Sequence, residues 1–187
     1  CHYLRKMGAR ISVEEKGIIV IDGVSYLKGG DMQVPPDRIV AGTYICAAAA
    51  TRGKIEILNP PEGELNAFLK VYRKIGGQYK VNSGKLLVDA GGIHAPADYV
   101  ETGAYPGFPT DLQSPLMAVL LTVSGKSHIR ETIFEARYKA AEEMRHMGAH
   151  IQIRERDAFI DGGFPLTGCT VKAEELRGGA ALILAAL

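Results

Sequence analysis

The sequence predicts an α/β fold built from repeated units, with apolar helices inside and β-sheets outside. A segment that reads as a helix end, a glycine and two strands occurs three times, about every 70 residues. A helix that is apolar nearly all round follows each of these copies. A doubly wound parallel sheet fits less well, because its strands would be continuous apolar runs, whereas these strands alternate.

The recurring segment begins with a basic, amphipathic helix end. The three copies occupy residues 4–23, 72–92 and 144–163. Gly8, Gly76 and Gly148 follow the helix ends, where a left-handed C-cap favours glycine. A short alternating strand, a polar turn and a second strand come next, and an Asp-Gly or Gly-Gly pair closes each copy. The predicted strand pairs are 10–13 with 18–21, 78–81 with 86–88, and 150–153 with 158–160.

The apolar helices are predicted over residues 37–50, 111–123 and 175–187. A helix without a polar face has to be buried, which places these three in the interior. Each begins with an acidic residue, and such a residue is expected to cap the free amides at the positive end of the helix dipole. The three acids are Asp37, Asp111 and Glu175.

Composition places the chain among ordinary globular proteins. Of its 187 residues, 47% are hydrophobic and 23% charged, and the formal net charge is +1. This charge gives no reason to expect nucleic acid or an anionic membrane as partner. Apolar runs are shorter than the roughly 20 residues that a bilayer requires. Cys1, Cys46 and Cys169 are too widely spaced for a zinc site or a disulfide framework, which favours a cytoplasmic protein.

Both ends of the sequence read as interrupted. The chain begins without a methionine inside a predicted helix, and it stops inside another without a stop signal after Leu187. We therefore expect a fragment of a longer protein.

Four longer motifs can be compared with known families: residues 36–54 (PDRIVAGTYICAAAATRGK), 105–113 (YPGFPTDLQ), 131–138 (ETIFEARY) and 175–181 (ELRGGAA). Together they resemble the UDP-N-acetylglucosamine 1-carboxyvinyltransferase family of enolpyruvyl transferases. The resemblance covers essentially the whole chain. It implies an inside-out α/β barrel fold, with two domains of three repeats each. Residues 1–33 would then end the last repeat of one barrel, and residues 34–187 would supply two repeats and the start of a third of the other.

The resemblance also implies a reaction. The enolpyruvyl group of phosphoenolpyruvate is transferred to the 3-hydroxyl of UDP-N-acetylglucosamine, and phosphate leaves, as the first committed step of peptidoglycan synthesis. Such chemistry needs a carboxylate for the hydroxyl proton and arginines for the anionic donor. It needs no metal and no redox cofactor. The implied partners are these two substrates.

Asp111 matches the family aspartate that contacts the reacting hydroxyl and is its candidate acid or base. Its alternative interpretation is a helix N-cap, which the preceding Pro109-Thr110 supports. Arg177 matches an arginine that faces phosphoenolpyruvate. Its alternative is an exposed arginine at a helix start, where the dipole disfavours a cation.

Ile133, Phe134 and Arg137 match positions on the nucleotide-sugar side of the family's cleft. Without the resemblance, the first two would be core residues and the third a surface charge. Two residues depart from the family pattern: Ala136 stands where asparagine is common, and Glu175 where aspartate is common. The catalytic role that the resemblance gives to Glu175 therefore stays open.

Asp37 and Arg38 start the first apolar helix, where a cap and an interdomain contact are favoured over catalysis. Ser124-Gly125-Lys126-Ser127 lacks the leading glycine of a phosphate-binding loop, since Leu120 occupies that position. The pair His146 and His150 lacks an acidic partner, so no metal site is predicted.

Three alternatives remain. The sister enzyme that makes 5-enolpyruvylshikimate 3-phosphate shares fold and donor. A non-catalytic paralogue would bind the nucleotide sugar only. The chain alone, with half of the catalytic groups outside it, is expected to be inactive and prone to self-association through exposed apolar surface.

Overall fold

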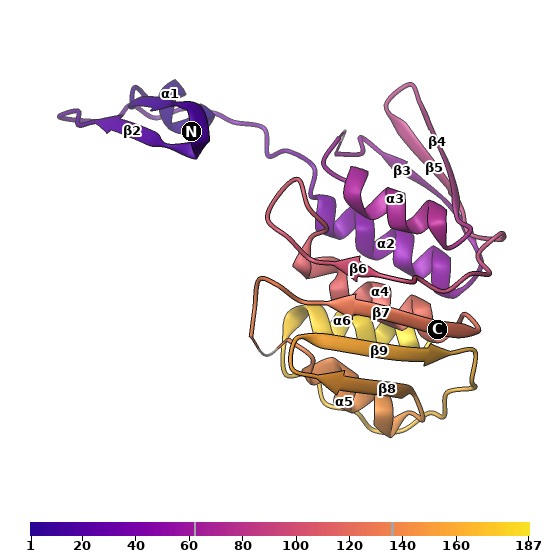
Figure 1. The fold of residues 1–187 in the computed structure, drawn as a ribbon. Helices are drawn as coiled ribbons and strands as arrows, with labels where there is room; N and C mark the ends of the chain where they lie inside the picture. The colour runs from indigo at the N-terminus through magenta and orange to yellow at the C-terminus, as the bar shows by residue number, and fades with distance from the viewer. Residues whose placement is uncertain (62, 136) are drawn as a thin grey trace. The chain divides into compact units, whose positions relative to one another are not determined.

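The computed structural model describes residues 1–61, 63–135 and 137–187. The chain forms two compact units, Cys1–Pro35 and Pro36–Leu187 (Figure 1). The division lies next to the boundary expected after residue 33. The assignment of the two units to two barrel domains stays a prediction.

The first unit is a short helix followed by a hairpin. Its elements are α1 (His2–Lys6), β1 (Arg10–Val13), the 3-10 turn η1 (Glu15–Gly17) and β2 (Ile19–Asp22). The two strands pair antiparallel, with Arg10 opposite Asp22. Gly8 separates helix from strand at φ +102°, as the sequence predicted.

The second unit contains the other two copies of the segment, and both fold as predicted. One consists of α3 (Asn66–Lys74), β4 (Gln78–Asn82) and β5 (Lys85–Asp89), the other of α5 (Lys139–His146), β8 (His150–Arg154) and β9 (Asp157–Gly162). In each, the strands form an antiparallel hairpin. Gly76 and Gly148 adopt φ +105° and +92° after the helices. The glycine therefore marks the same helix stop in each copy.

Both hairpins of the second unit are extended into larger sheets by strands that the sequence did not predict. β3 (Lys54–Leu58) pairs with β5, giving the order β3-β5-β4. β7 (Gly125–Arg130) pairs with β9, and the short β6 (Val100–Glu101) runs parallel to β7, giving the order β6-β7-β9-β8. Ser124-Gly125-Lys126-Ser127, considered above as the end of a phosphate-binding loop, thus leads into β7, an inner strand of its sheet. All other pairs of strands in the described part of the chain are antiparallel, which excludes a doubly wound sheet there.

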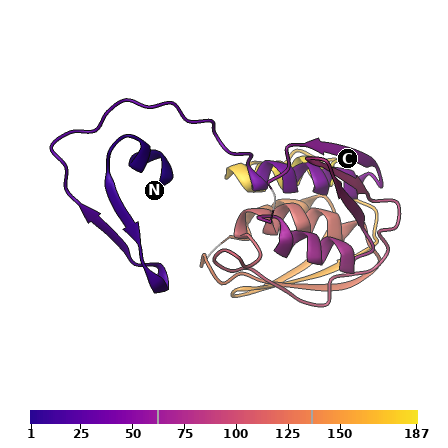
Figure 2. The ribbon, with the colours of Figure 1, turned by 90° about the horizontal axis from the view of Figure 1, so that it is seen from above.

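Three helices lie side by side between the sheets (Figures 1 and 2). They are α2 (Arg38–Ala50), α4 (Gln113–Leu121), which follows the 3-10 turn η2 (Thr110–Leu112), and α6 (Leu176–Ala185). α4 touches both of its neighbours, and all nine of its residues are buried, as predicted.

Complete burial was wrong for α2 and α6, whereas the exposed apolar surface expected of the chain by itself is present on both helices. Tyr44 on α2 and Ile183 on α6 are 64% and 68% exposed. α2 and α6 pack against α4 and against one another, and no described element of the second unit covers these two side chains. The apolar side chains of α2 and α6 therefore spread over more of the helix surface than this chain buries.

α2 and α4 run in the same direction. Near their starts, Gly42 lies against Leu112, where an added Cβ would be 2.3 Å from a methyl carbon. Beyond their ends, the Arg52 guanidinium donates to Ala49 O at 2.8 Å and to Thr122 O at 2.9 Å. Arg52 therefore links the last carbonyls of both helices. Every helix within the described residues is too short or too polar to cross a membrane.

Candidate functional site

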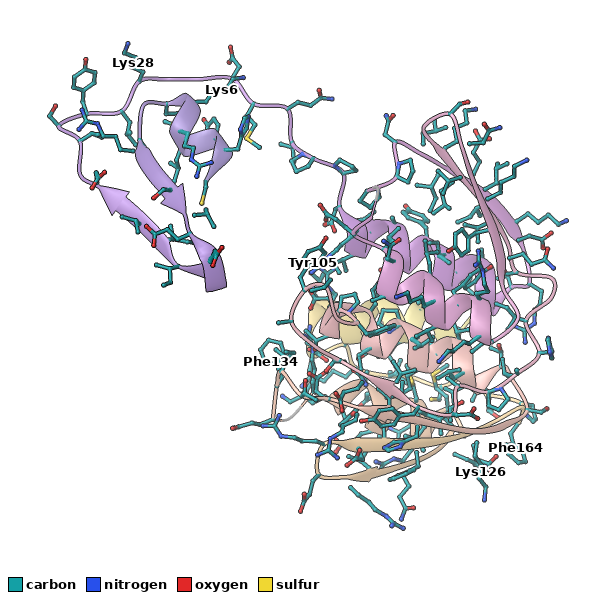
Figure 3. The ribbon with its side chains drawn as sticks, turned by 45° about the horizontal axis from the view of Figure 1, so that its top comes forward. Lys6, Lys28, Tyr105, Lys126, Phe134 and Phe164 are labelled. Carbon is teal, nitrogen blue, oxygen red and sulfur yellow. The ribbon has the colours of Figure 1, made fainter. Side chains whose placement is uncertain are left out.

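The residues that the resemblance singled out gather at the end of the second unit where its inner helices begin. Three segments meet there: η2, the connection between β7 and α5, and the start of α6. Figure 3 shows Phe134 and Tyr105 at this end, whereas Lys126 and Phe164 lie toward the other. The site is thus assembled from stretches far apart in the sequence.

Asp111 does not cap a helix, which corrects the alternative drawn from the sequence. η2 starts after Pro109, and within the described residues no side chain caps η2 or α4. The carboxylate instead faces two arginines. Arg137 Nη2 donates to Asp111 Oδ1 at 2.5 Å, and Arg177 Nη2 lies 3.9 Å from Oδ2. The charge partners on both oxygens orient this carboxylate, which is 37% exposed.

Arg137 is the central cation of the site. Its side chain is only 12% exposed, so it is not the surface charge that the pattern alone suggested. Nη1 donates to Thr110 Oγ1 at 3.0 Å, and Nε lies 4.0 Å from Glu175 Oε2. The guanidinium carbon sits 4.7 Å from the centre of the Phe134 ring, within range of a cation–π contact. Several groups therefore fix this side chain.

Glu175 stands at the N-cap position of α6, yet its side chain accepts no capping hydrogen bond from the described residues. Oε1 is buried and has no hydrogen-bond partner within the described part of the chain. The carboxylate packs against Gly178, where an added Cβ would come within 3.0 Å of Cγ. A buried oxygen without a donor is costly, so this carboxylate is available to a proton or to a ligand.

Arg177 lies in the first turn of α6 with its side chain 26% exposed. A cation is disfavoured at this end of a helix, and the nearby Asp111 offsets part of that cost. Ile133 is 42% exposed and Phe134 50%, so neither is the core residue that the alternative interpretation described. Ala136, the other departure from the family pattern, lies outside the described residues.

Glu131 is a site residue that sequence reasoning did not single out. Its side chain is completely buried, and its carboxylate accepts hydrogen bonds from the hydroxyls of Thr102 and Thr110 at 2.9 and 2.7 Å. It also accepts from the backbone amides of Ile133 and Phe134 at 2.8 and 3.1 Å. Its position in the motif gave no signal, because both threonines come from segments well before it.

Tyr138 anchors the far end of the same connection. Its hydroxyl lies 2.9 Å from Arg156 O and 3.2 Å from Ile129 O, and its single proton is donated to one of these carbonyls at a time. Burial raises the pKa of this phenol, so it remains a donor at neutral pH. Arg137 is therefore next to a residue that is fixed to the end of β7 and to the turn between β8 and β9.

At the start of α2, Asp37 caps the helix as predicted, since Oδ1 accepts from Ile39 N at 2.6 Å and Val40 N at 3.4 Å. The Arg38 guanidinium lies 5.2 Å from the centre of the Tyr105 ring. The interdomain contact expected of these two residues stays a prediction.

This geometry, a carboxylate between guanidiniums at helix starts, agrees with the resemblance found in the sequence. The family model of EPSP synthase (3-phosphoshikimate 1-carboxyvinyltransferase) matches residues 1–187. The chain belongs to this EPSP synthase family. Relatives that are 40–45% identical over the whole chain bear the name predicted from the motifs, which confirms that resemblance.

A UDP-N-acetylglucosamine 1-carboxyvinyltransferase 2 from Clostridium tetani is 45% identical over 185 residues. The match covers 99% of this chain and 44% of that protein, so the chain spans less than half of this relative. A UDP-N-acetylglucosamine 1-carboxyvinyltransferase from Desulfofundulus thermocisternus is 43% identical, over 100% of this chain and 76% of that protein.

Solved structures of an enolpyruvyl transferase and of an EPSP synthase share the fold. The enolpyruvyl transferase NikO from Streptomyces tendae is similar with a TM-score of 0.82 and 25% identity, over 97% of this chain and 44% of that one. EPSP synthase from Acinetobacter baumannii is similar with a TM-score of 0.64 and 23% identity, over 83% of this chain and 38% of that one. The latter supports the fold alone.

Proposed function

We propose that this chain is part of an enzyme that transfers the enolpyruvyl group of phosphoenolpyruvate to the 3-hydroxyl of UDP-N-acetylglucosamine, with release of phosphate. The observation that carries the proposal is the position of Asp111 between Arg137 and Arg177. It supplies one carboxylate for a hydroxyl proton and two fixed cations for anionic substrates, which this chemistry requires. The names of the relatives supply the substrate pair.

In this proposal Asp111 takes the proton of the attacking hydroxyl. Arg177 contacts the carboxylate or phosphate of phosphoenolpyruvate, because a guanidinium can bind either group through two parallel hydrogen bonds. The exposed side chains of Ile133 and Phe134 contact the nucleotide sugar, and Arg137 orients both Phe134 and Asp111. Glu175 is a second carboxylate at the site, whose unpaired oxygen is suited to a proton transfer.

The architecture of the intact protein belongs to the same proposal. The two units would come from two inside-out barrels, the first ending one barrel and the second supplying two repeats and the start of a third. The exposed apolar faces of α2 and α6 support this, since a further repeat would cover them. The chain by itself is then expected to be inactive and to self-associate.

Phosphate release tests the proposal directly. The full-length protein that contains this chain would be given phosphoenolpyruvate with either UDP-N-acetylglucosamine or shikimate 3-phosphate. Release with the nucleotide sugar only, and its loss in Asp111→Asn, is the expected result. Asp98→Asn is a matched control, because Asp98 is exposed and distant from the site.

Two other functions have support, and each predicts a different outcome of the phosphate-release assay. The family description, 3-phosphoshikimate 1-carboxyvinyltransferase, favours a shikimate acceptor, which would show as release with shikimate 3-phosphate only. A non-catalytic paralogue, indicated by the Glu175 and Ala136 departures, would bind the nucleotide sugar and release no phosphate with either acceptor. Either outcome would replace the proposed reaction.

A further inference from the structure

We propose that Glu131 is a positioning residue for the nucleotide-sugar side of the site, an inference that rests on the proposed function. It lies behind the residues expected to touch substrate and touches none itself, because its side chain is completely buried. Its carboxylate ties the segment that carries Ile133 and Phe134 to the turn that carries Asp111.

All four partners of this carboxylate are donors. Oε1 accepts from Ile133 N, Phe134 N and Thr102 Oγ1, and Oε2 accepts from Thr110 Oγ1. A carboxylate accepts only, so the ionised form satisfies every group around it. Glutamine at this position would place its NH2 group, itself a donor, against one of these four donors. The four donors therefore favour a side chain that only accepts hydrogen bonds, at a position buried from water.

The hydroxyl of Thr110 carries the effect of Glu131 to the reacting groups. Because Thr110 Oγ1 gives its proton to Glu131 Oε2, its lone pairs face Arg137 Nη1, which donates to it at 3.0 Å. The same guanidinium then holds Asp111 Oδ1. A continuous hydrogen-bonded chain thus runs from the buried carboxylate to the exposed one, and its direction is set by Glu131.

The other repeat shows that the fold does not need this carboxylate. Asn59 is the first residue after β3, as Glu131 is the first after β7. The amides of both donate to the turn of the neighbouring hairpin, Asn59 N to Gly84 O at 3.0 Å and Glu131 N to Arg156 O at 2.8 Å. Yet Asn59 is exposed. A buried charge is costly. The presence of the Glu131 carboxylate only in the one of these two repeats that carries the site therefore indicates a role in the site.

The test is a steady-state comparison of the full-length protein with Glu131→Gln, which keeps shape and removes charge. Phosphate release would be measured while each substrate is varied in turn. We expect KM for UDP-N-acetylglucosamine to rise and kcat to fall, each by about tenfold, while KM for phosphoenolpyruvate changes by less than about twofold. Loss of folded protein alone would lower the apparent kcat and leave both KM values unchanged.

Glu135→Gln is the matched control, because the Glu135 side chain is 90% exposed and 3.9 Å from Arg156. It should leave both KM values and kcat unchanged. Thr110→Val provides a second test if Glu131→Gln does not fold, since it removes the linking hydroxyl and should reproduce the same selective rise in KM. Thr110→Ser should restore wild-type values.

The outcomes separate this inference from the proposed function. Release of phosphate by the unmodified protein, with unchanged KM values in folded Glu131→Gln or in Thr110→Val, overturns the role of Glu131 only. A rise in both KM values by the same factor also overturns it, because it would indicate general distortion. Absence of release from the unmodified protein overturns the proposed function and this inference with it.

Discussion

Arg137 holds the carboxylate of Asp111, which lies 26 residues earlier, at a distance of 2.5 Å from Nη2 to Oδ1. A second nitrogen of the same guanidinium is bound to Thr110. Two adjacent residues of one turn are therefore held by the two branches of a single planar group. The orientation of the candidate acid or base depends on the connection between β7 and α5, which also carries the exposed Phe134.

Arg137→Lys tests this dependence. Lysine keeps the charge but lacks the planar fork, so it cannot bind Thr110 and Asp111 with the same geometry. In the full-length protein we expect kcat/KM for phosphate release to fall by about 10- to 100-fold, since one charge-assisted hydrogen bond contributes about 1.5–3 kcal/mol. Arg145→Lys on the exposed side of α5 should change nothing. Equal activity of both variants would show that Arg137 acts as a point charge.

Gly76→Ala and Gly148→Ala separate backbone strain from steric clash. Both glycines have positive φ, and an added Cβ costs roughly 1–2 kcal/mol in the left-handed region. At Gly148 the nearest atom would be 3.8 Å away, whereas at Gly76 the Cβ would lie 2.2 Å from Gly92 O. We therefore expect Gly76→Ala to lower the free energy of unfolding by at least about 2 kcal/mol more than Gly148→Ala. Urea denaturation measures both, and equal losses would contradict the close approach of the Gly92 carbonyl to Gly76.

Arg52→Ala removes the link between the ends of α2 and α4. The guanidinium donates to one carbonyl of each region and to Thr122 Oγ1 at 3.1 Å, and a cation is favourable at helix C-termini. The expected loss in the free energy of unfolding is about 1–3 kcal/mol. Arg52→Lys should recover part of it, because lysine retains the positive charge at the helix ends. A thermal midpoint unchanged in both variants would show that the link adds no stability.

Asp157 should make stability depend on pH in the acid range. A hydrogen bond from His128 lowers the pKa of this carboxyl group, with a further contribution from the charge of Arg130, while burial opposes them. A lowered pKa in the folded state means that the stabilisation is present above the usual value of about 3.9 and is lost as pH falls through the folded value. Thermal midpoints measured from pH 6 downward, at about half-unit steps, should fall less steeply in Asp157→Asn. Parallel curves would exclude this carboxylate as a source of the acid sensitivity.

Local patterns in the sequence were sufficient for the recurring segment. Helix end, glycine and hairpin are set by neighbouring residues, and Gly8, Gly76 and Gly148 all have the predicted positive φ. β7 could not be found in this way, because its sequence GKSHIR reads as polar. It becomes a strand through distant partners: Ile129 is buried, and Ser127 Oγ accepts from Ala97 N at 3.0 Å. Such pairing is decided by tertiary contacts.

The site shows the same limit. The motifs identified Asp111, Arg137, Arg177 and Glu175, and the structure brings them together. Their mutual contacts were not predictable, since the local Pro-Thr-Asp pattern favoured a cap for Asp111. Glu131 could not be recognised, because a glutamate in sequence carries no sign that it will be buried beneath two threonines from earlier segments. The roles of all these residues in catalysis and binding stay predictions.

The shared direction of α2 and α4 makes ligand occupancy and folding interdependent. Parallel neighbours bring like partial charges together at both ends, an unfavourable arrangement that Arg52 relieves at the negative end. At the positive end, Asp37 caps α2, and the carboxylate of Asp111 lies between the guanidiniums of Arg137 and Arg177. In the proposed function an anionic substrate would bind these guanidiniums and the helix-start amides. The unliganded protein should consequently be the easier one to unfold, and each bound substrate would strengthen the structure that binds it.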